Sequence, residues 1–174
     1  MEQRDTFSGA ISRTITNLNI GKDIAHLLGI EKDNLQDKCT LPGGRLYNRL
    51  TPVVGVFGTS SRQGKFTVQM ELRKRFLQHG YTVGQIVSGP SGYLLQCDGV
   101  FPFGYHANIL TCAEDSVAIL NRMLWDASGH NTKDVILVGG QSGVVPYSYH
   151  NISQYNFKEY EFLCGVNPGV YFMY

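Results

Sequence analysis

The sequence predicts an α/β protein with a doubly wound, mostly parallel sheet and helices on both faces, in a Rossmann-like three-layer sandwich. Short apolar runs alternate with segments whose apolar residues recur at helical spacing, which is typical of parallel sheets with helical crossovers. Glycine-rich turns follow the apolar runs, where such sheets place their ligand loops. With 174 residues, 43% of them apolar and 17% charged, the chain is large enough for one well-cored domain.

The regular pattern begins at Thr51. The apolar run "VVGVF" at 53–57 predicts a buried strand. After a glycine-bearing loop, the segment 66–79 predicts a helix, because its apolar side chains recur every three to four residues. Gly80 follows as a helix stop. This part of the chain therefore predicts a strand, a loop and a helix in succession.

Three further strands and one long helix are expected beyond residue 80. The segment 81–89 predicts a second strand that ends in a Gly-Pro turn. A long helix is expected over 107–127, and the nearly continuous apolar run at 134–140 is typical of a parallel strand covered on both faces. The run "EFLCGV" at 161–166 predicts a fourth strand that ends at an Asn-Pro-Gly turn.

The sequence suggests a boundary near residue 50. Residues 1–50 are less regular and are expected to be a lead-in or the tail of a preceding small domain, while 51–174 form the main domain. The chain ends on "VYFMY", which is apolar and aromatic. Either a partner covers this end or the chain is cut short, and a sheet of only four strands favours truncation.

The loop after the first strand has the composition of a phosphate-binding loop. A strand, a glycine-rich loop and a helix together direct backbone N–H groups and the positive end of the helix dipole at one point. Gly58 and Gly64 allow tight turns, and Lys65 would reach the terminal phosphates of a nucleotide. The alternative is a plain strand-to-helix connection whose lysine faces water. The nucleotide-binding candidates in this loop are Gly58, Thr59, Ser60, Ser61, Arg62, Gln63, Gly64, Lys65, Phe66 and Thr67.

Two positions depart from the common form of this loop. Five residues separate the glycines where four are usual, and Phe66 follows the lysine where a Ser or Thr hydroxyl would ligate Mg²⁺. A metal would need other oxygen ligands. Ser60 and the charged Asp98 are the metal candidates, with Asp98 expected on the ligand side of the sheet. Asp98 precedes a glycine, so a simple turn explains it equally well.

Three segments occur in an order that resembles that of one protein family. They are "GTSSRQGKFT", "SGPSGYLLQCDGVFPFGY" and "VILVGGQSGVVPYSYHN". Together they resemble a bacterial P-loop family described as a domain of unknown function, closest to its branch of peptide maturation system proteins. The resemblance covers residues 51–169. It implies the P-loop NTPase-like fold of dethiobiotin synthetase and septum-site ATPase relatives, which bind ATP with Mg²⁺ and often work as dimers. It also implies a Rossmann-like unit before this domain and a longer chain after it.

Carried over residue by residue, the resemblance matches the phosphate loop at Gly58, Gly64, Lys65 and Thr67. It also matches Gly140 and Gln141 to a Glu-Gly-Gln segment after the third strand. The glutamate of that segment corresponds to Gly139 here, and Ser60 stands where many relatives have an aspartate. Two carboxylates that could hold Mg²⁺ or polarise a water are therefore absent from these positions. The sequence accordingly favours binding over catalysis.

Composition excludes several other functions. Fifteen basic and fourteen acidic residues leave a formal charge of +1, which gives no footprint for nucleic acid or an anionic membrane. No apolar run is long enough to span a membrane, and the polar start does not resemble a secretory signal, so a cytoplasmic location is expected. The four cysteines are too far apart for a metal-binding motif.

Two hypotheses follow. The first is a P-loop NTPase that uses ATP or GTP with Mg²⁺ to activate a carboxylate or to drive a peptide-modifying step, with Lys65 and Asp98 as catalytic residues. Its partners would be the nucleotide and a peptide or small carboxylate, in a homodimer. The second is a nucleotide-sensing or scaffold module without turnover, which the missing carboxylates favour.

Overall fold

The structure is a computed structural model that describes residues 45–89, 91–101, 112–140 and 142–173. Its strands are β1 (Val53–Phe57), β2 (Val83–Val87), β3 (Gly99–Val100), β4 (Val135–Gly139) and β5 (Val170–Met173). Its helices are α4 (Lys65–Gln78), α5 (Ser91–Leu94), α6 (Ala113–Ala127) and α7 (Phe157–Val166), with a 3₁₀ turn η2 (Ile152–Gln154) before the last helix.

The described strands form one parallel sheet in the order β3-β2-β4-β1-β5. From β1 the chain crosses through α4 to β2 and β3, returns to β4, and then passes through α7 to β5 on the other side of β1. The carboxyl ends of β1 and β4 lie side by side, with Val56 opposite Gly139. The chain leaves β1 for strands on one side of it and later reaches β5 on the other side. The carboxyl edge beside β1 is therefore the expected ligand side of the sheet.

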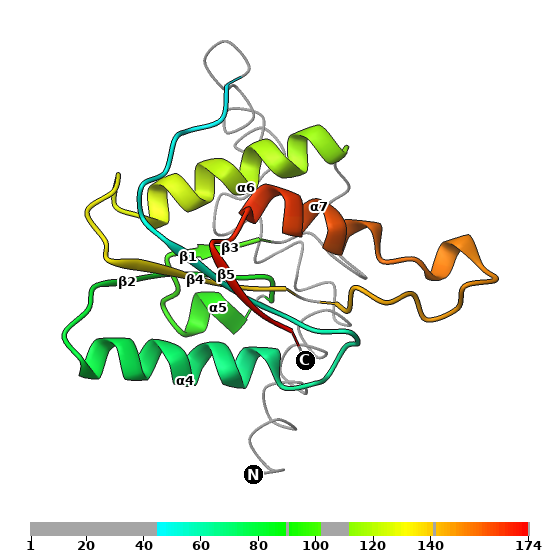
Figure 1. Ribbon diagram of the computed structural model, residues 1–174, viewed down its shortest axis with the longest axis horizontal. Helices are drawn as coiled ribbons and strands as arrows, with labels where there is room; N and C mark the ends of the chain where they lie inside the picture. The colour runs from blue at the N-terminus through cyan, green and yellow to red at the C-terminus, as the bar shows by residue number, and fades with distance from the viewer. Residues whose placement is uncertain (1–44, 90, 102–111, 141, 174) are drawn as a thin grey trace.

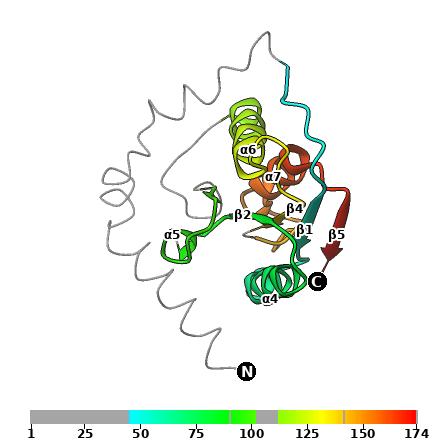
Figure 2. The same ribbon diagram turned by 90° about the vertical axis from the view of Figure 1, so that its left-hand side faces the viewer.

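Helices cover both faces of the sheet (Figures 1 and 2). One face packs against α6 and α7 through a cluster that includes Phe57, Leu120 and Phe162. The other packs against α4, where Leu72 and Phe76 contact the apolar side chains of β2 and β4. The predicted doubly wound sheet with three layers is confirmed.

The strands predicted at 53–57, 81–89 and 134–140 are confirmed as β1, β2 and β4. β3 was not predicted, because its two residues are too few to show a pattern. The long helix is shorter than expected: Cys112 has an extended backbone and α6 begins after it. Residues 107–111 lie outside the described residues.

The predicted strand at 161–166 is wrong, because these residues form the last turns of α7. Glu159, Phe162 and Val166 are its buried positions, at helical spacing. Asn167 ends the helix with a left-handed backbone (φ 41°), and a proline follows, which is a usual helix stop. The sequence predicts a strand before the Asn-Pro-Gly turn. In the structure the strand lies after that turn, as β5.

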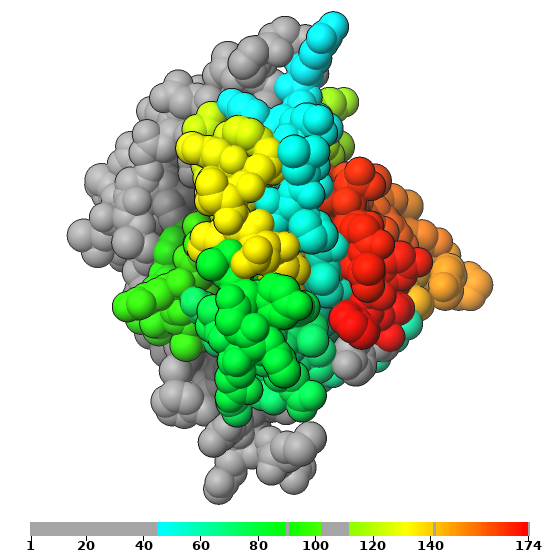
Figure 3. All heavy atoms as spheres, turned by 60° about the vertical axis from the view of Figure 1, so that its left-hand side comes forward, coloured from blue at the N-terminus to red at the C-terminus, as the bar shows by residue number. Residues whose placement is uncertain are grey.

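The described lead-in, residues 45–50, packs against α6 and the end of α7. Tyr47 stacks on Trp125 with ring centroids 5.4 Å apart and exchanges backbone hydrogen bonds with the Asn121 side chain. Arg49 donates to the Val166 carbonyl at 2.7 Å, at the carboxyl end of α7. Figure 3 shows this segment, in cyan, beside the yellow residues that join α6 to β4. The predicted boundary at residue 50 remains a prediction.

Candidate functional site

The loop from Gly58 to Gly64 joins the carboxyl end of β1 to the amino end of α4. Gly64 has φ 83° and ψ 13° immediately before the helix, a left-handed backbone that favours glycine. It has no side chain that could cap the first amide groups of α4. The loop therefore directs these N–H groups and the positive end of the helix dipole at its own centre, as an anion site requires.

Lys65 lies inside this loop. Its side chain passes over Gly58, where a Cβ would be 3.1 Å from the Lys65 ammonium, and Nζ donates to the Ser60 carbonyl at 2.7 Å. The residue is 6% exposed, so a lysine that simply faces water is excluded. Burial lowers the pKa of Lys65, and the charge of Glu159 acts in the opposite direction. A buried ammonium is thus held at the centre of the loop.

Gln63 fixes the shape of the loop from within. Its side-chain oxygen accepts from the Ser60 amide at 2.9 Å, and its side-chain nitrogen donates to the Thr59 hydroxyl at 3.0 Å. A Cβ at Gly58 would lie 2.7 Å from that oxygen. The amide of Gln63 and the small size of Gly58 therefore depend on each other.

Residues 142–145, called here the docking segment, lie directly against the loop. Val144 N donates to the Gly58 carbonyl at 2.9 Å, and Val145 N donates to the Thr59 carbonyl at 3.2 Å. Gly143 contacts the loop so closely that a Cβ there would be 2.5 Å from the backbone nitrogen of Ser60. The chain leaving β4 thus forms one wall of the loop.

The first turn of α7 holds the docking segment from its other side. The side-chain nitrogen of Asn156 donates to the Gly143 carbonyl at 2.8 Å, and the Tyr160 hydroxyl donates to the Val144 carbonyl at 2.6 Å. The Glu159 carboxylate accepts from the Ser142 amide at 3.1 Å. The loop, the docking segment and α7 form one continuous set of contacts.

Glu159 was not among the predicted site residues. It is 3% exposed, and its carboxylate occupies the place into which a side chain at Gly140 would project. The sequence signals only a helix start here, because Asn156 and Glu159 have the spacing of a capping box. In the structure Asn156 makes no side-chain cap, and both side chains bind the docking segment instead.

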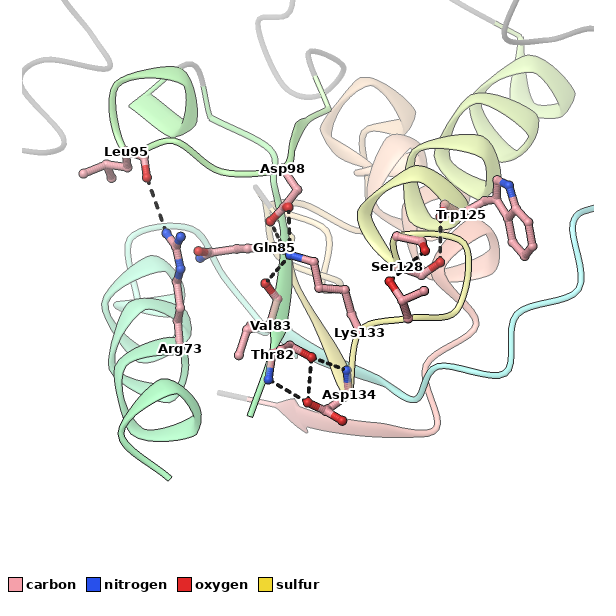
Figure 4. A network of polar contacts seen from close by, with 12 residues as sticks. Arg73, Thr82, Val83, Gln85, Leu95, Asp98, Trp125, Ser128, Lys133 and Asp134 are labelled. Carbon is pink, nitrogen blue, oxygen red and sulfur yellow. Dashed lines mark hydrogen bonds and ion pairs between the residues drawn. The ribbon is translucent and has the colours of Figure 1, made fainter. Parts of the chain in front are cut away.

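The structure brings together the predicted loop residues but leaves Asp98 elsewhere. Figure 4 shows Asp98 beside Gln85 and Lys133. Asp98 accepts from the Gln85 amide at 2.8 Å and pairs with Lys133 at 3.4 Å. Lys133 also donates to the carbonyl of Val83, the first residue of β2. Asp98 therefore lies toward the amino ends of β2 and β4, away from the loop, and the expectation that it faces the ligand side was wrong. Gln141 lies outside the described residues.

Comparison with known proteins identifies the family. The chain matches the P-loop domain of DUF1611, a domain of unknown function, over residues 41–170. The chain belongs to this family. A DUF1611 family protein from Anabaena variabilis ATCC 29413 is a structural neighbour, with a TM-score of 0.53 and 19% identity over 79% of this chain. The chain spans 33% of that protein's length. No curated protein matches it.

The family match agrees with the geometry of the loop, since a P-loop domain places its phosphate loop between the first strand and the following helix. Membership in a P-loop family indicates nucleotide binding. The finer resemblance to peptide maturation proteins and to the synthetase and septum-site relatives remains a prediction. Within the described parts of the DUF1611 domain, no helix is long and apolar enough to cross a membrane.

The donors around the loop suit a magnesium ion bound mainly through nucleotide phosphates. Among the residues described, no three His, Cys, Asp or Glu side chains gather as a ready metal site. The loop does supply the hydroxyls of Thr59, Ser60 and Ser61, and the adjoining turn of α7 supplies the Glu159 carboxylate. Mg²⁺ prefers such oxygen donors and takes only one or two carboxylates beside substrate phosphates and water. These oxygen donors would fit Mg²⁺ beside a bound nucleotide, whereas Asp98 lies away from the loop.

Proposed function

We propose that this domain binds the phosphates of ATP or GTP at the loop between β1 and α4. The observation that carries the proposal is the position of Lys65, a buried ammonium inside a glycine-rich loop at the amino end of a helix. A triphosphate would offer Nζ stronger acceptors than the neutral Ser60 carbonyl, because hydrogen bonds between charged groups are about twice as strong as neutral ones. The backbone amides of the loop would hold the remaining phosphate oxygens.

Two forms of this function compete. In the first, the domain turns over the nucleotide with Mg²⁺ and uses it to activate a carboxylate or drive a peptide-modifying step. In the second, it binds nucleotide as a sensing or scaffold module. Phe66 favours the second form, because its ring replaces the hydroxyl that normally ligates the metal. Turnover is therefore assayed only after binding has been measured.

The test is nucleotide affinity measured by calorimetry. ATP and GTP are titrated into the protein with Mg²⁺ and, separately, with a chelator. Lys65→Ala removes the ammonium from the loop. Lys74→Ala is the matched control, because Lys74 lies on the same helix with a 63% exposed side chain and only a distant ion pair to Glu71. Circular dichroism and a thermal melt establish that each variant is folded.

We expect the unaltered protein and Lys74→Ala to bind equally well, and Lys65→Ala to lose at least tenfold in affinity, since truncating one charge-assisted contact of about 1.5–3 kcal/mol costs that much. Equal binding by all three proteins would mean that the phosphates do not reach Lys65. Absence of binding by the folded, unaltered protein would remove both forms of the function.

A further inference from the structure

Glu159 is a buried carboxylate beside the proposed phosphate loop. Placing an ionised carboxylate in a protein interior is costly unless other groups compensate its charge. Here the backbone makes room for it at Gly140, because any side chain at that position would collide with its carboxylate. The carboxylate accepts from the Ser142 amide at 3.1 Å, so it is held at the carboxyl end of β4.

The same carboxylate acts on the lysine of the loop. Lys65 and Glu159 are 6% and 3% exposed, and the charge of Glu159 partly offsets the effect of burial on the pKa of Lys65. Charges interact over a longer range in such surroundings than at a solvated surface, because water screens them less. Glu159 therefore belongs electrostatically to the loop, although it lies 94 positions further along the chain.

We propose that Glu159 supplies the acidic group of the nucleotide site and, through water or directly, helps to hold the Mg²⁺ ion of a bound nucleoside triphosphate. This inference rests on the proposed function. The carboxylate would come from the first turn of α7, at the carboxyl edge where the two strands beside the loop end. It would serve a site in which Gly139 and Ser60 offer no carboxylate.

A purely structural role is the competing explanation, since Glu159 also holds the docking segment through Ser142. Glu159→Gln separates the two roles. The glutamine oxygen can still accept from the Ser142 amide, whereas the negative charge is lost. Glu161→Gln is the matched control, because it makes the same change on the same helix at a residue whose partner is Lys158, 2.6 Å away.

The experiment measures, by calorimetry, the ratio of ATP affinity with Mg²⁺ to ATP affinity with chelator. We expect Glu159→Gln to reduce this ratio by about tenfold or more, the usual cost of losing a group that supports a bound metal. Its affinity in chelator should be unchanged or higher, because a negative charge near the phosphates has been removed. Glu161→Gln should leave both affinities as they are.

The outcomes separate the two proposals. If the unaltered protein binds no nucleotide, the proposed function fails. If it binds with a magnesium-dependent gain and Glu159→Gln keeps that gain, the function stands and the assignment of Glu159 is overturned. A Glu159→Gln protein that loses affinity equally with Mg²⁺ and with chelator, at a lowered melting temperature, would show the structural role alone and would also overturn the assignment.

Discussion

The side chain of Gln69 occupies the space in front of Gly139. A Cβ at position 139 would lie 2.5 Å from the Gln69 side-chain oxygen. Gln69 is fully buried on α4, and its side-chain nitrogen donates to the carbonyls of Ile86 (2.8 Å) and Leu137 (3.2 Å), in β2 and β4. The side chain of Gln69 therefore leaves no room for a glutamate at position 139, where the family resemblance implies one.

Gly139→Ala is expected to destabilise the fold by about 1–3 kcal/mol, the usual cost of adding a methyl group to a packed interior. The added carbon must displace Gln69 and weaken its bonds to the two strands. In a Gln69→Ala background the cost of the same change should be smaller. A double-mutant cycle in urea measures this coupling, and additive effects would contradict the contact.

Asp98→Ala is expected to lower the free energy of unfolding by about 1–3 kcal/mol, because the backbone amide of the buried Gln85 loses its acceptor. Asp98→Asn should cost less, since its side-chain oxygen can still accept from that amide. Neither change should alter the magnesium dependence of nucleotide binding, measured by calorimetry. A loss of that dependence at unchanged stability would restore the predicted metal role of Asp98.

Gly143→Ala is expected to separate the docking segment from the loop, because the new carbon would collide with backbone atoms of Thr59 and Ser60 that cannot move aside. We predict a loss of about 1–3 kcal/mol in stability and a weaker nucleotide affinity. Gly169→Ala is the control: a Cβ there would be 4.0 Å from the Val53 carbonyl, an ordinary contact. Equal melting temperatures for the two variants would refute the tight packing.

Asp134 should make stability depend on pH in acid. The amide and hydroxyl of Thr82 donate to its carboxylate at 2.7 and 2.6 Å, which lowers its pKa below the ordinary 3.8. The folded state thus binds the proton less readily than the unfolded chain. The stabilising contribution is fully present above pH 3.8 and is lost as the pH falls through the lower, folded-state pKa.

Asp134→Asn tests this dependence, because the amide cannot titrate. The difference in unfolding free energy between the unaltered protein and the variant, measured in urea at a series of acidic pH values, should shrink as the pH falls. A difference that stays constant across the series would show that the two hydrogen bonds do not favour the ionised form.

The sequence predicted the sheet and the loop because both depend on local patterns. A buried run followed by glycines and an amphipathic helix specifies its own structure, and Gly64 has the left-handed backbone of a tight turn. The role of Lys65 in phosphate binding remains a prediction. The site beyond the loop depends on contacts between distant residues. Nothing near Glu159 indicates that its carboxylate returns to Ser142, and the short apolar run after it resembles a strand as well as a helix.

Asp98 shows the opposite difficulty. The sequence predicts Asp98 on the ligand side because it follows the strand at 81–89 and precedes the helix expected at 107–127. The two-residue strand β3 follows it directly, so Asp98 lies at the start of a strand and not beyond the end of one. Because β3 is too short to show periodicity, the sequence predicted Asp98 at the wrong edge of the sheet.

The contacts of the docking segment determine when the site can exist during synthesis. The phosphate loop is complete in the chain once Lys65 has been made, yet its wall comes from residues 142–145 and the support of that wall from Asn156, Glu159 and Tyr160. A nascent chain that ends before α7 carries the glycine-rich loop and residues 142–145, but it lacks the Glu159 and Tyr160 side chains that hold those residues in place. Under the proposed function, nucleotide can therefore stabilise the complete site only after residues up to Tyr160 have left the ribosome.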